Sequence, residues 1–220
     1  MKTVLIKEDI LSRNNERAKE VREELGRRNI FYVNVMSSPG AGKTTLLTGL
    51  INELKNDYRI GVIEADIDSD TDALAVERAT GVKTIQMHTG GACHITCQMS
   101  MEALEALGLD GLDLVFLENI GNLVCPAEFD TGANLNLVLL SVPEGDDKPL
   151  KYPLMFQVAS AVAVTKTDVS PIFDFNRERA VNNVRFRNPG IPVFFTAAAK
   201  GEGVSAVAAY IKNEIKKTVQ

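Results

Sequence analysis

A glycine-rich segment near the start of the chain carries the strongest chemical signal in the sequence. Residues 37–45 read SSPGAGKTT and separate an apolar stretch from a stretch with helical periodicity. Small residues in such a turn let backbone N–H groups approach phosphate oxygens at the first turn of a helix, where the helix dipole favours negative charge. We therefore expect a phosphate-binding loop. Its expected nucleotide-binding residues are Gly40, Ala41, Gly42, Lys43, Thr44 and Thr45.

Two of these side chains have individual roles. The ammonium group of Lys43 can reach the β- and γ-phosphates of a nucleotide, and the hydroxyl of Thr44 can coordinate Mg²⁺. The common eight-residue signature opens with glycine, whereas Ser37 holds that position here. A glycine-rich turn that merely caps a helix is the alternative interpretation. The position of the segment between a strand and a helix favours phosphate binding.

Acidic strand ends could complete the nucleotide site. Asp66 follows an apolar strand, and the acidic stretch after it contains Asp68, Asp70 and Asp72. Carboxylates this close to a triphosphate need Mg²⁺ between them or a segment that moves, so the stretch suits a switch, with a solvated loop as the alternative. Glu118 ends a later strand and can hold a magnesium-bound water, while Gly121 can present its N–H to the γ-phosphate. With Lys43 and Thr44, these residues form the expected catalytic set.

A later strand end has residues that could read a guanine base. In the segment TKTD, Asp168 can accept hydrogen bonds from the guanine N1–H and amine, and the stem of Lys166 can cover the base. Thr165 opens the segment. An ordinary strand-to-helix turn is the alternative interpretation. Ala198 belongs to a final stretch of small residues whose backbone N–H groups could reach guanine O6.

Cysteine and histidine residues provide a second candidate chemistry. Cys93 and His94 follow a Gly-Gly turn, and Cys125 follows Gly121 closely, so a metal there would be attached to the segment that senses the γ-phosphate. Thiolate and imidazole groups suit Zn²⁺ and Ni²⁺. Cys97 lies one helical turn after Cys93, so both could share a helix face, and Cys97 is a further candidate ligand. Free cysteine is often a small buried hydrophobe, and that interpretation stays open.

Length and composition limit the classes of protein. The chain has 220 residues, of which 45% are hydrophobic and 24% charged, and its formal net charge is −5. This length predicts one domain with a full core. The acidic balance argues against nucleic-acid binding, and no apolar run approaches a membrane span. Glu8 and Asp9 are unlike a signal peptide, and three cysteines predict thiols or metal ligands in a cytoplasmic protein.

Apolar stretches and helical patterns alternate along the chain. The expected helices cover about 5–29, 72–80 and 93–107, and a further helix follows the phosphate-binding loop and ends near residue 54. The expected strands cover 31–36, 59–65, 82–87, 112–117, 135–142, 161–165 and 192–196. This alternation predicts an α/β fold with a mainly parallel sheet and helices on both faces, in which ligands bind at the carboxyl ends of the strands. We expect a single domain, 1–220, with an N-terminal helix at about 5–29 and a nucleotide core at about 30–218.

Several motifs, taken together, resemble one known family. Their order is SSPGAGKTTLL, VIEAD, CHI, ENIGNLVCPAEFD, EGDDKPLKYP and TKTD. This order resembles HypB, the family of nickel-insertion GTPases in the maturation of nickel–iron hydrogenases, from about residue 5 to 218. The two longest motifs are far more specific than a phosphate loop alone. The resemblance implies a P-loop NTPase fold, slow GTP hydrolysis with Mg²⁺, and Ni²⁺ or Zn²⁺ held by a homodimer.

The resemblance also implies roles for individual residues. Asp66 and Glu118 would line the magnesium site with Thr44, and Asp168 would read guanine. The residues that match the family's metal-binding set at a dimer interface are Cys93, His94 and Cys125. In the family the base-reading segment usually opens with asparagine, where this chain has Thr165. The family's CHLDA stretch reads CHITC here, which adds the cysteine at position 97.

The family pattern also implies partners. An aspartate of the switch would face a lysine of the other protomer in the GTP-bound dimer, and these positions are Asp72 and Lys151 here. A solvated loop lysine is the alternative interpretation of Lys151. The other implied partners are the hydrogenase large subunit and a second nickel-maturation protein. Neither nucleic acid nor a membrane is expected.

Our interpretation is a GTP-hydrolysing metallochaperone, and three alternatives stay open. The related urease-type nickel GTPase shares the fold but lacks a Cys-His pair followed by NLVCP. A P-loop ATP-dependent kinase or ligase of small metabolites is the second alternative, because Thr165 departs from the guanine-reading pattern. A structural, nucleotide-locked scaffold with buried thiols is the third.

Lys43→Ala tests the phosphate-binding loop. The substitution removes the only cation of the segment SSPGAGKTT and leaves the apolar pattern of the chain unchanged. We expect the variant to unfold at the same temperature as the parent and to lose detectable nucleotide binding, because the lysine is the side chain that contacts the phosphates. Thermal unfolding and titration with a fluorescent nucleotide measure the two properties. Equal nucleotide affinities in both proteins would contradict the assignment.

Overall fold

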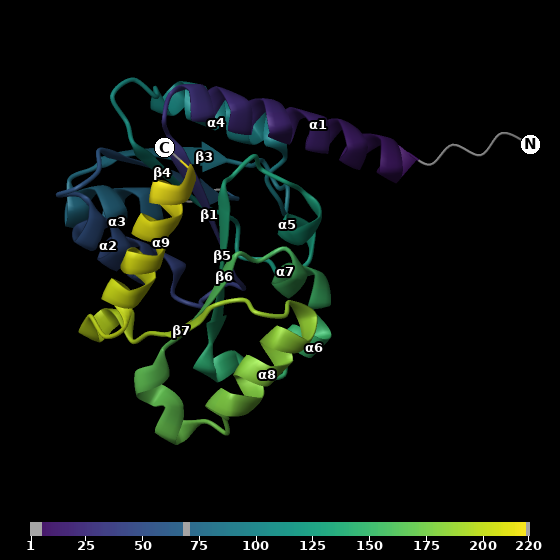
Figure 1. The fold of residues 1–220 in the computed structure, drawn as a ribbon, viewed down its shortest axis with the longest axis vertical. Coiled ribbons are helices and arrows are strands. Elements are labelled where there is room, and N and C mark those ends of the chain that lie inside the picture. Colours follow the sequence, from purple (N-terminus) through teal and green to yellow (C-terminus); the bar gives the residue numbers. More distant parts are fainter. Residues whose placement is uncertain (1–5, 68–70, 219–220) are drawn as a thin grey trace, which may run out of the picture.

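A seven-stranded parallel sheet forms the centre of the molecule (Figure 1). The computed structural model describes residues 6–67 and 71–218. The strand order is β3-β2-β4-β1-β5-β6-β7, and all neighbouring strands are parallel. The strands are β1 (Phe31–Met36), β2 (Ile60–Asp66), β3 (Lys83–His88), β4 (Leu114–Glu118), β5 (Leu135–Ser141), β6 (Ala161–Thr165) and β7 (Val193–Phe195).

Helices connect the strands and cover the sheet. The α-helices are α1 (Ile6–Arg27), α2 (Lys43–Leu54), α3 (Thr71–Thr80), α4 (Cys97–Leu107), α5 (Cys125–Glu128), α6 (Lys148–Lys151), α7 (Pro153–Gln157), α8 (Arg177–Arg187) and α9 (Val204–Thr218). The 3₁₀ segments are η1 (Val142–Glu144), η2 (Thr167–Ile172) and η3 (Ala198–Lys200). Among the described residues, none of the helices is both long and apolar enough to cross a bilayer. The α/β fold class, with its parallel sheet and N-terminal helix, is confirmed.

Strand side chains alternate between two buried layers. Val33 faces the layer of α2, α3 and α9, whereas its neighbour Tyr32 faces the layer of α1 and α4. Met36 belongs to a third cluster, which continues the second face under α5, α7 and α8. This alternation follows from the two-residue period of a strand. The carboxyl ends of the strands are left between the layers, and the candidate residues lie there.

A buried side chain fixes α1 to the elements that carry cysteines. Asn14 is 7% exposed. Its amide donates to the carbonyl of Asp130 at 2.8 Å, and its oxygen accepts from the backbone N–H of Cys97 at 2.7 Å. One residue of α1 therefore orders both the start of α4 and the loop after α5.

The start of α4 corrects one prediction from the sequence. The helix begins at Cys97 and not at Cys93, because Thr96 caps it by accepting a hydrogen bond from the backbone N–H of Met99 at 3.2 Å. Cys93 lies in the preceding loop. The prediction that Cys93 and Cys97 share a helix face is therefore wrong.

Other predicted elements differ only at their ends. The expected strand 112–117 is β4, Leu114–Glu118, and the expected strand 192–196 is β7, Val193–Phe195. The short helices α5, α6 and α7 were not predicted, because four or five residues carry too little periodicity to be recognised. Asp68 and Asp70 of the expected switch lie outside the described residues.

Candidate nucleotide and metal site

The turn between β1 and α2 has the backbone geometry that glycine provides. Gly40 has a φ of 72° and Gly42 a φ of 92°, in the region that L-residues rarely adopt. Gly42 precedes the first turn of α2, and no side chain caps that turn. The first N–H groups of a helix have no partner within the helix, so they can bind an anion. The predicted phosphate loop therefore has the local geometry for its task.

A cation, a hydroxyl and a carboxylate converge beside this turn. The Thr44 hydroxyl donates to Glu118 Oε1 at 2.9 Å, and Lys43 Nζ lies 3.9 Å from the same oxygen. Glu118, at the end of β4, is 4% exposed. Burial leaves these charges little screening by water, so each strongly affects the others.

A second buried carboxyl, which we did not anticipate from the sequence, lies beside Glu118. Glu64 on β2 is its register partner and is 2% exposed. Burial and the charge of Glu118 raise the pKa of Glu64 to about 10. Burial raises the pKa of Glu118 to about 6, although Lys43 and the Thr44 hydroxyl both lower it. Glu64 therefore keeps its proton at neutral pH, while Glu118 is the member of the pair that ionises.

The pair also shows how Mg²⁺ would fit. Glu118 Oε2 and Glu64 Oε1 are buried with no hydrogen-bond donor in the part of the chain that the structure describes. A proton between the two carboxyls or a cation beside them removes the cost of burying such atoms. Asp66 ends β2 two residues beyond Glu64 and is partly buried. Thr44, Asp66 and Glu118 thus supply the hydroxyl and carboxylate oxygens that Mg²⁺ prefers.

The segment after β4 lies directly against the phosphate loop. A Cβ atom placed on Gly121 would be 2.9 Å from both the Cα and the backbone nitrogen of Pro39. A Cβ atom does not approach other heavy atoms this closely in real proteins, so only glycine fits at this position without moving the loop. Gly121 was predicted to sense the γ-phosphate, and the structure places it within reach of that loop.

The base-reading segment is fastened to the same loop. The Thr165 hydroxyl donates to the carbonyl of Ala41 at 2.6 Å, and Lys166 Nζ donates to the carbonyl of Gly40 at 2.7 Å. Lys166 has a φ of 57°, a strained value that these contacts hold in place. Thr165 differs from the family's asparagine, yet its hydroxyl still joins the base-reading segment to the phosphate loop.

Asp168 and Ala198 lie on neighbouring loops. Asp168, in η2, is exposed and lies 3.6 Å from Lys200 Nζ. Ala198 begins η3, and the two loops are joined by a backbone hydrogen bond from Thr167 to Thr196 at 3.1 Å. Both residues are therefore brought to the edge of the phosphate loop, where the side chain of Asp168 is 25% exposed.

Three of the four predicted metal ligands form a cluster. One ligand atom each from Cys93, His94 and Cys125 lies within 4.8 Å of the others. The two sulfur atoms are 3.0 Å apart, and Cys93 Sγ is 3.8 Å from His94 Nδ1. Cys97 is not part of this cluster and is fully buried in the core between α1 and α4. Burial raises the pKa of the Cys97 thiol to about 11.

The cluster is organised by its neighbours. The Asn122 amide donates to the carbonyl of Cys93 at 3.2 Å, and this contact joins the two loops that carry the ligands. The ring of His94 stacks on Phe129 with centroids 3.9 Å apart. Burial lowers the pKa of His94, which favours the neutral imidazole that binds metal, and the hydrogen bond to Cys125 raises the pKa of Cys93.

The two residues of the expected contact between protomers are both exposed. Asp72 lies in the first turn of α3, and its charge contributes to the raised pKa values of Glu64 and Glu118. Lys151, at the end of α6, forms an ion pair with Asp147 at 2.5 Å within the chain. Thr45 is exposed in the first turn of α2.

Comparison with known proteins places the chain in one family. Residues 31–194 match the family described as CobW/HypB/UreG, nucleotide-binding domain. The chain is 45% identical over 96% of its length to the hydrogenase maturation factor HypB of Azotobacter chroococcum mcd 1, and it covers 69% of that protein. The chain belongs to the HypB family. A second relative is the hydrogenase/urease maturation factor HypB of Helicobacter hepaticus, 41% identical over 100% of this chain and 91% of its own.

A solved HypB structure has the same fold. It is the crystal structure of HypB from Helicobacter pylori in complex with nickel, which is 35% identical to this chain. The match covers 94% of this chain and 97% of that one, with a TM-score of 0.88. The P-loop α/β architecture of the family is therefore present here along almost the whole chain.

Substitutions of Glu64 test its role beside Glu118. Glu64→Gln replaces the O–H donor of the protonated carboxyl with an amide N–H donor, whereas Glu64→Leu removes the donor. We expect the Gln variant to keep the Mg²⁺ dependence of nucleotide binding and the Leu variant to need at least tenfold more Mg²⁺, because a hydrogen bond to a charged group contributes about 1.5–3 kcal/mol. Nucleotide affinity measured across a Mg²⁺ titration checks this. An equal loss in both variants would contradict a neutral, donating Glu64.

Asp168→Asn tests base recognition. Two hydrogen bonds from guanine to a carboxylate are lost, at about 1.5–3 kcal/mol each, so we expect GTP to bind at least tenfold more weakly while xanthosine triphosphate becomes a ligand. Asp174→Asn is the matched control, since Asp174 is another exposed acid nearby. Competition titrations with GTP, xanthosine triphosphate and ATP measure the preference. If ATP competes as well as GTP in the parent protein, the guanine assignment is wrong.

Proposed function

We propose that this chain is a GTP-hydrolysing metallochaperone that holds nickel or zinc between two protomers and assists nickel insertion into a hydrogenase. One observation carries the proposal. The segment of Gly121, Asn122 and Cys125 touches the phosphate loop at one end and the metal cluster at the other. A change at the γ-phosphate therefore has a short physical route to the metal ligands.

The proposed nucleotide chemistry uses few side chains. Lys43 and the N-terminus of α2 bind the phosphates, and Asp168 with Lys166 orients the base. When bound, Mg²⁺ neutralises phosphate charge, and Thr44, Asp66 and Glu118 hold it. Glu64 keeps its proton at neutral pH and does not act as a general base. With hydrolysis dependent on positioning and electrostatics, we expect slow turnover.

The proposed cargo site uses the soft ligands. Cys93, His94 and Cys125 provide two sulfurs and one imidazole, which suit Ni²⁺ and Zn²⁺. Cys93 is exposed, so a second protomer can approach the cluster and add its own ligands. The nickel complex of the Helicobacter pylori relative supports nickel as the cargo. We propose the hydrogenase large subunit and a second nickel-maturation protein as the other partners.

The three alternative functions, a urease-type GTPase, an ATP-dependent kinase or ligase and a scaffold, are supported to different degrees. The name of the Helicobacter hepaticus relative includes urease, so a urease client is the second candidate function. An ATP-dependent kinase or ligase is less well supported, because Thr165 and Lys166 both reach the phosphate loop and leave Asp168 open to a base. A scaffold with buried thiols is disfavoured, because Cys93 is exposed and Cys125 only partly buried. We also propose that residues 30–218 act as one nucleotide domain with α1 packed on it.

Nickel titration in two nucleotide states tests the proposed coupling between the nucleotide site and the metal ligands. The variant is Gly121→Ala. In the parent we expect Ni²⁺ affinity to differ by about tenfold between GDP and a non-hydrolysable GTP analogue, a usual size for coupled sites. In Gly121→Ala the added Cβ displaces Pro39, so we expect the ratio to fall toward one. Gly26→Ala is the control, because its Cβ would meet open space. An unchanged ratio in Gly121→Ala would contradict the proposed route.

Lys151→Ala tests the contact between protomers. An exposed ion pair contributes about 0–1 kcal/mol to folding, so we expect the variant to keep its thermal stability and GTP affinity. We expect it to lose dimerisation driven by the GTP analogue and to keep dimers formed by Ni²⁺ alone. Lys148→Ala, on the same short helix, is the control. Sedimentation of each protein with GDP, the GTP analogue or Ni²⁺ measures whether it dimerises. Dimerisation of Lys151→Ala at the parent's concentration dependence would exclude the contact.

A further inference from the structure

A groove between α1 and α4 lies apart from the nucleotide and metal sites. Its floor is apolar: Val21 and Leu25 of α1 are 5% and 1% exposed, and Leu104 of α4 is 4% exposed. Met101 and Leu109 complete the apolar lining. The groove holds about 230 Å³. An engineered cavity of about 150 Å³ accepts a benzene ring, so this groove has room for a large apolar side chain.

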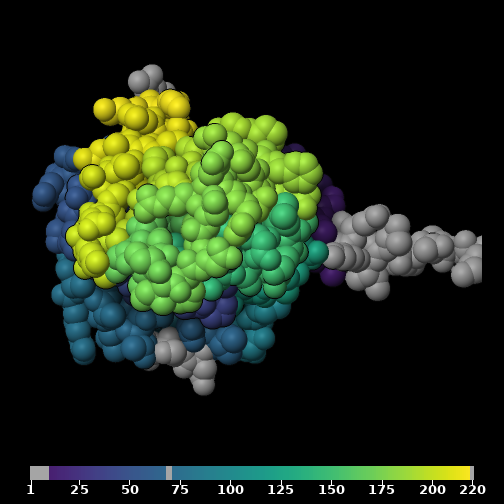
Figure 2. Space-filling model, turned by 90° about the horizontal axis from the view of Figure 1, so that it is seen from below, coloured from purple at the N-terminus to yellow at the C-terminus, as the bar shows by residue number. Residues whose placement is uncertain are grey.

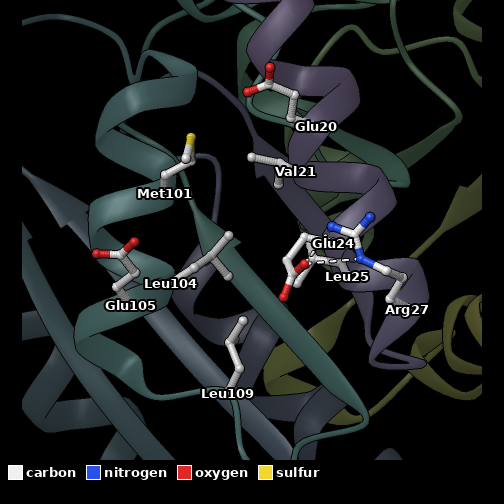
Figure 3. A pocket seen from close by; sticks show the side chains of 9 residues that line it. All are labelled: Glu20, Val21, Glu24, Leu25, Arg27, Met101, Leu104, Glu105 and Leu109. Atoms are coloured by element: carbon white, nitrogen blue, oxygen red, sulfur yellow. Dashed lines mark hydrogen bonds and ion pairs between the residues drawn. The ribbon is translucent and has the colours of Figure 1, made fainter.

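Three glutamates, Glu20, Glu24 and Glu105, and one cation, Arg27, stand along the rim of the groove (Figure 3). Glu24 already forms ion pairs with Arg27 at 2.6 Å and with Arg28 at 2.7 Å. Glu20 on α1 and Glu105 on α4 are exposed, and within residues 6–67 and 71–218 neither forms an ion pair. Two carboxylates without an ion pair, one on each helix, thus flank an apolar floor, and the lining keeps an acidic balance of three glutamates against one arginine.

The groove lies on a different side of the molecule from the base-reading segment. Figure 1 shows α1 and α4 together at one end of the molecule, with α8 at the other. Seen from below in Figure 2, the green and yellow segments that follow β6 cover the centre and top of the view, blue and teal segments surround them, and α1 appears only at the right edge. A protein seated between α1 and α4 therefore leaves the base-reading face uncovered.

We propose that the α1–α4 groove is a docking site for a basic amphipathic segment of a partner protein. The segment inserts an apolar side chain between the helices and places lysine or arginine beside Glu20 and Glu105. Charge complementarity selects this occupant. In a two-fold dimer through this face, each acidic rim would meet its own copy, and the chain as a whole carries a net charge of −5. An anionic lipid surface would be repelled for the same reason.

The position of the groove also suits docking. Met101 lies one turn after the start of α4 at Cys97, so the groove and the cysteine-bearing loop are carried by one helix. Asn14 fixes α1 to the first residue of that helix. The two walls are therefore held relative to each other before a partner arrives, which reduces the ordering cost of binding.

A pair of synthetic helical peptides tests the proposal on the full chain. One peptide has leucine along one face and lysine at the flanking positions, and in the other glutamate replaces every lysine. We expect the lysine peptide to bind at least tenfold more tightly in fluorescence anisotropy. Backbone amide shifts of the ¹⁵N-labelled chain should change around 20–27 and 101–109. Shifts concentrated elsewhere, or equal affinity for the two peptides, would overturn the proposal.

Charge-reversal variants separate specific docking from general attraction. Glu20→Lys with Glu105→Lys should weaken binding of the lysine peptide at least tenfold. Glu53→Lys with Glu77→Lys is the matched control, because these exposed residues lie on α2 and α3, across the sheet. The control should bind within about twofold of the parent, since charges this distant are screened by salt. Unchanged thermal unfolding confirms that each variant is folded.

Two results would exclude this occupant. Equal weakening in the rim variant and the control would show non-specific attraction to an acidic protein. A change in the sedimentation of the free chain, seen in the rim variant alone, would show that a second copy occupies the groove. Neither result depends on nucleotide or nickel binding, so the proposed function stands or falls separately.

Discussion

The close approach of Gly121 to Pro39 is the contact on which the arrangement of the two sites depends. The phosphate loop and the segment after β4 come from neighbouring strands of a parallel sheet, and their ends meet at one edge. Because no side chain separates them, movement of one backbone must displace the other. Asn122 then carries the contact to Cys93, and Cys125 follows on the same segment. In this way the predicted nucleotide site and the cluster of Cys93, His94 and Cys125 share one structural element.

The remaining contacts hold that edge of the sheet together from both sides. Thr165 and Lys166 donate to two consecutive carbonyls of the phosphate loop, so the base-reading segment and the loop form one unit. On the other side, Glu64 and Glu118 bury two carboxyls between β2 and β4. Such a pair is costly unless a proton or a cation lies between its members, which makes this edge sensitive to what is bound there. The sheet alone does not require these polar residues; the chemistry of the site does.

Some of the site could be predicted because its signals are local. The phosphate loop needs small residues at strained backbone positions, a lysine and a hydroxyl in one short run, and all of these are contiguous in the sequence. The helix start at Cys97 was missed for an equally local reason: Thr96 can cap a helix, but the apolar pattern begins earlier, at Cys93. Glu64 was missed because its importance comes from its register opposite Glu118. Each glutamate lies four residues after the first residue of its strand, Ile60 or Leu114, and this matching position was the signal that could have revealed the pair.

The sequence by itself determined the α/β fold class and the family and predicted the phosphate loop and a guanine-reading segment, because all of these depend on periodicity and on contiguous motifs. The tertiary structure alone decided which cysteines come together. Cys93, His94 and Cys125 meet because two loops from different strand ends are joined by Asn122, while Cys97 is withdrawn into the core by the helix that it begins. The structure alone also decided that Glu64 pairs with Glu118 and that α1 and α4 leave an acidic-rimmed groove. Spacing along a chain does not determine distance in space, since that depends on strand order, register and the packing of distant helices.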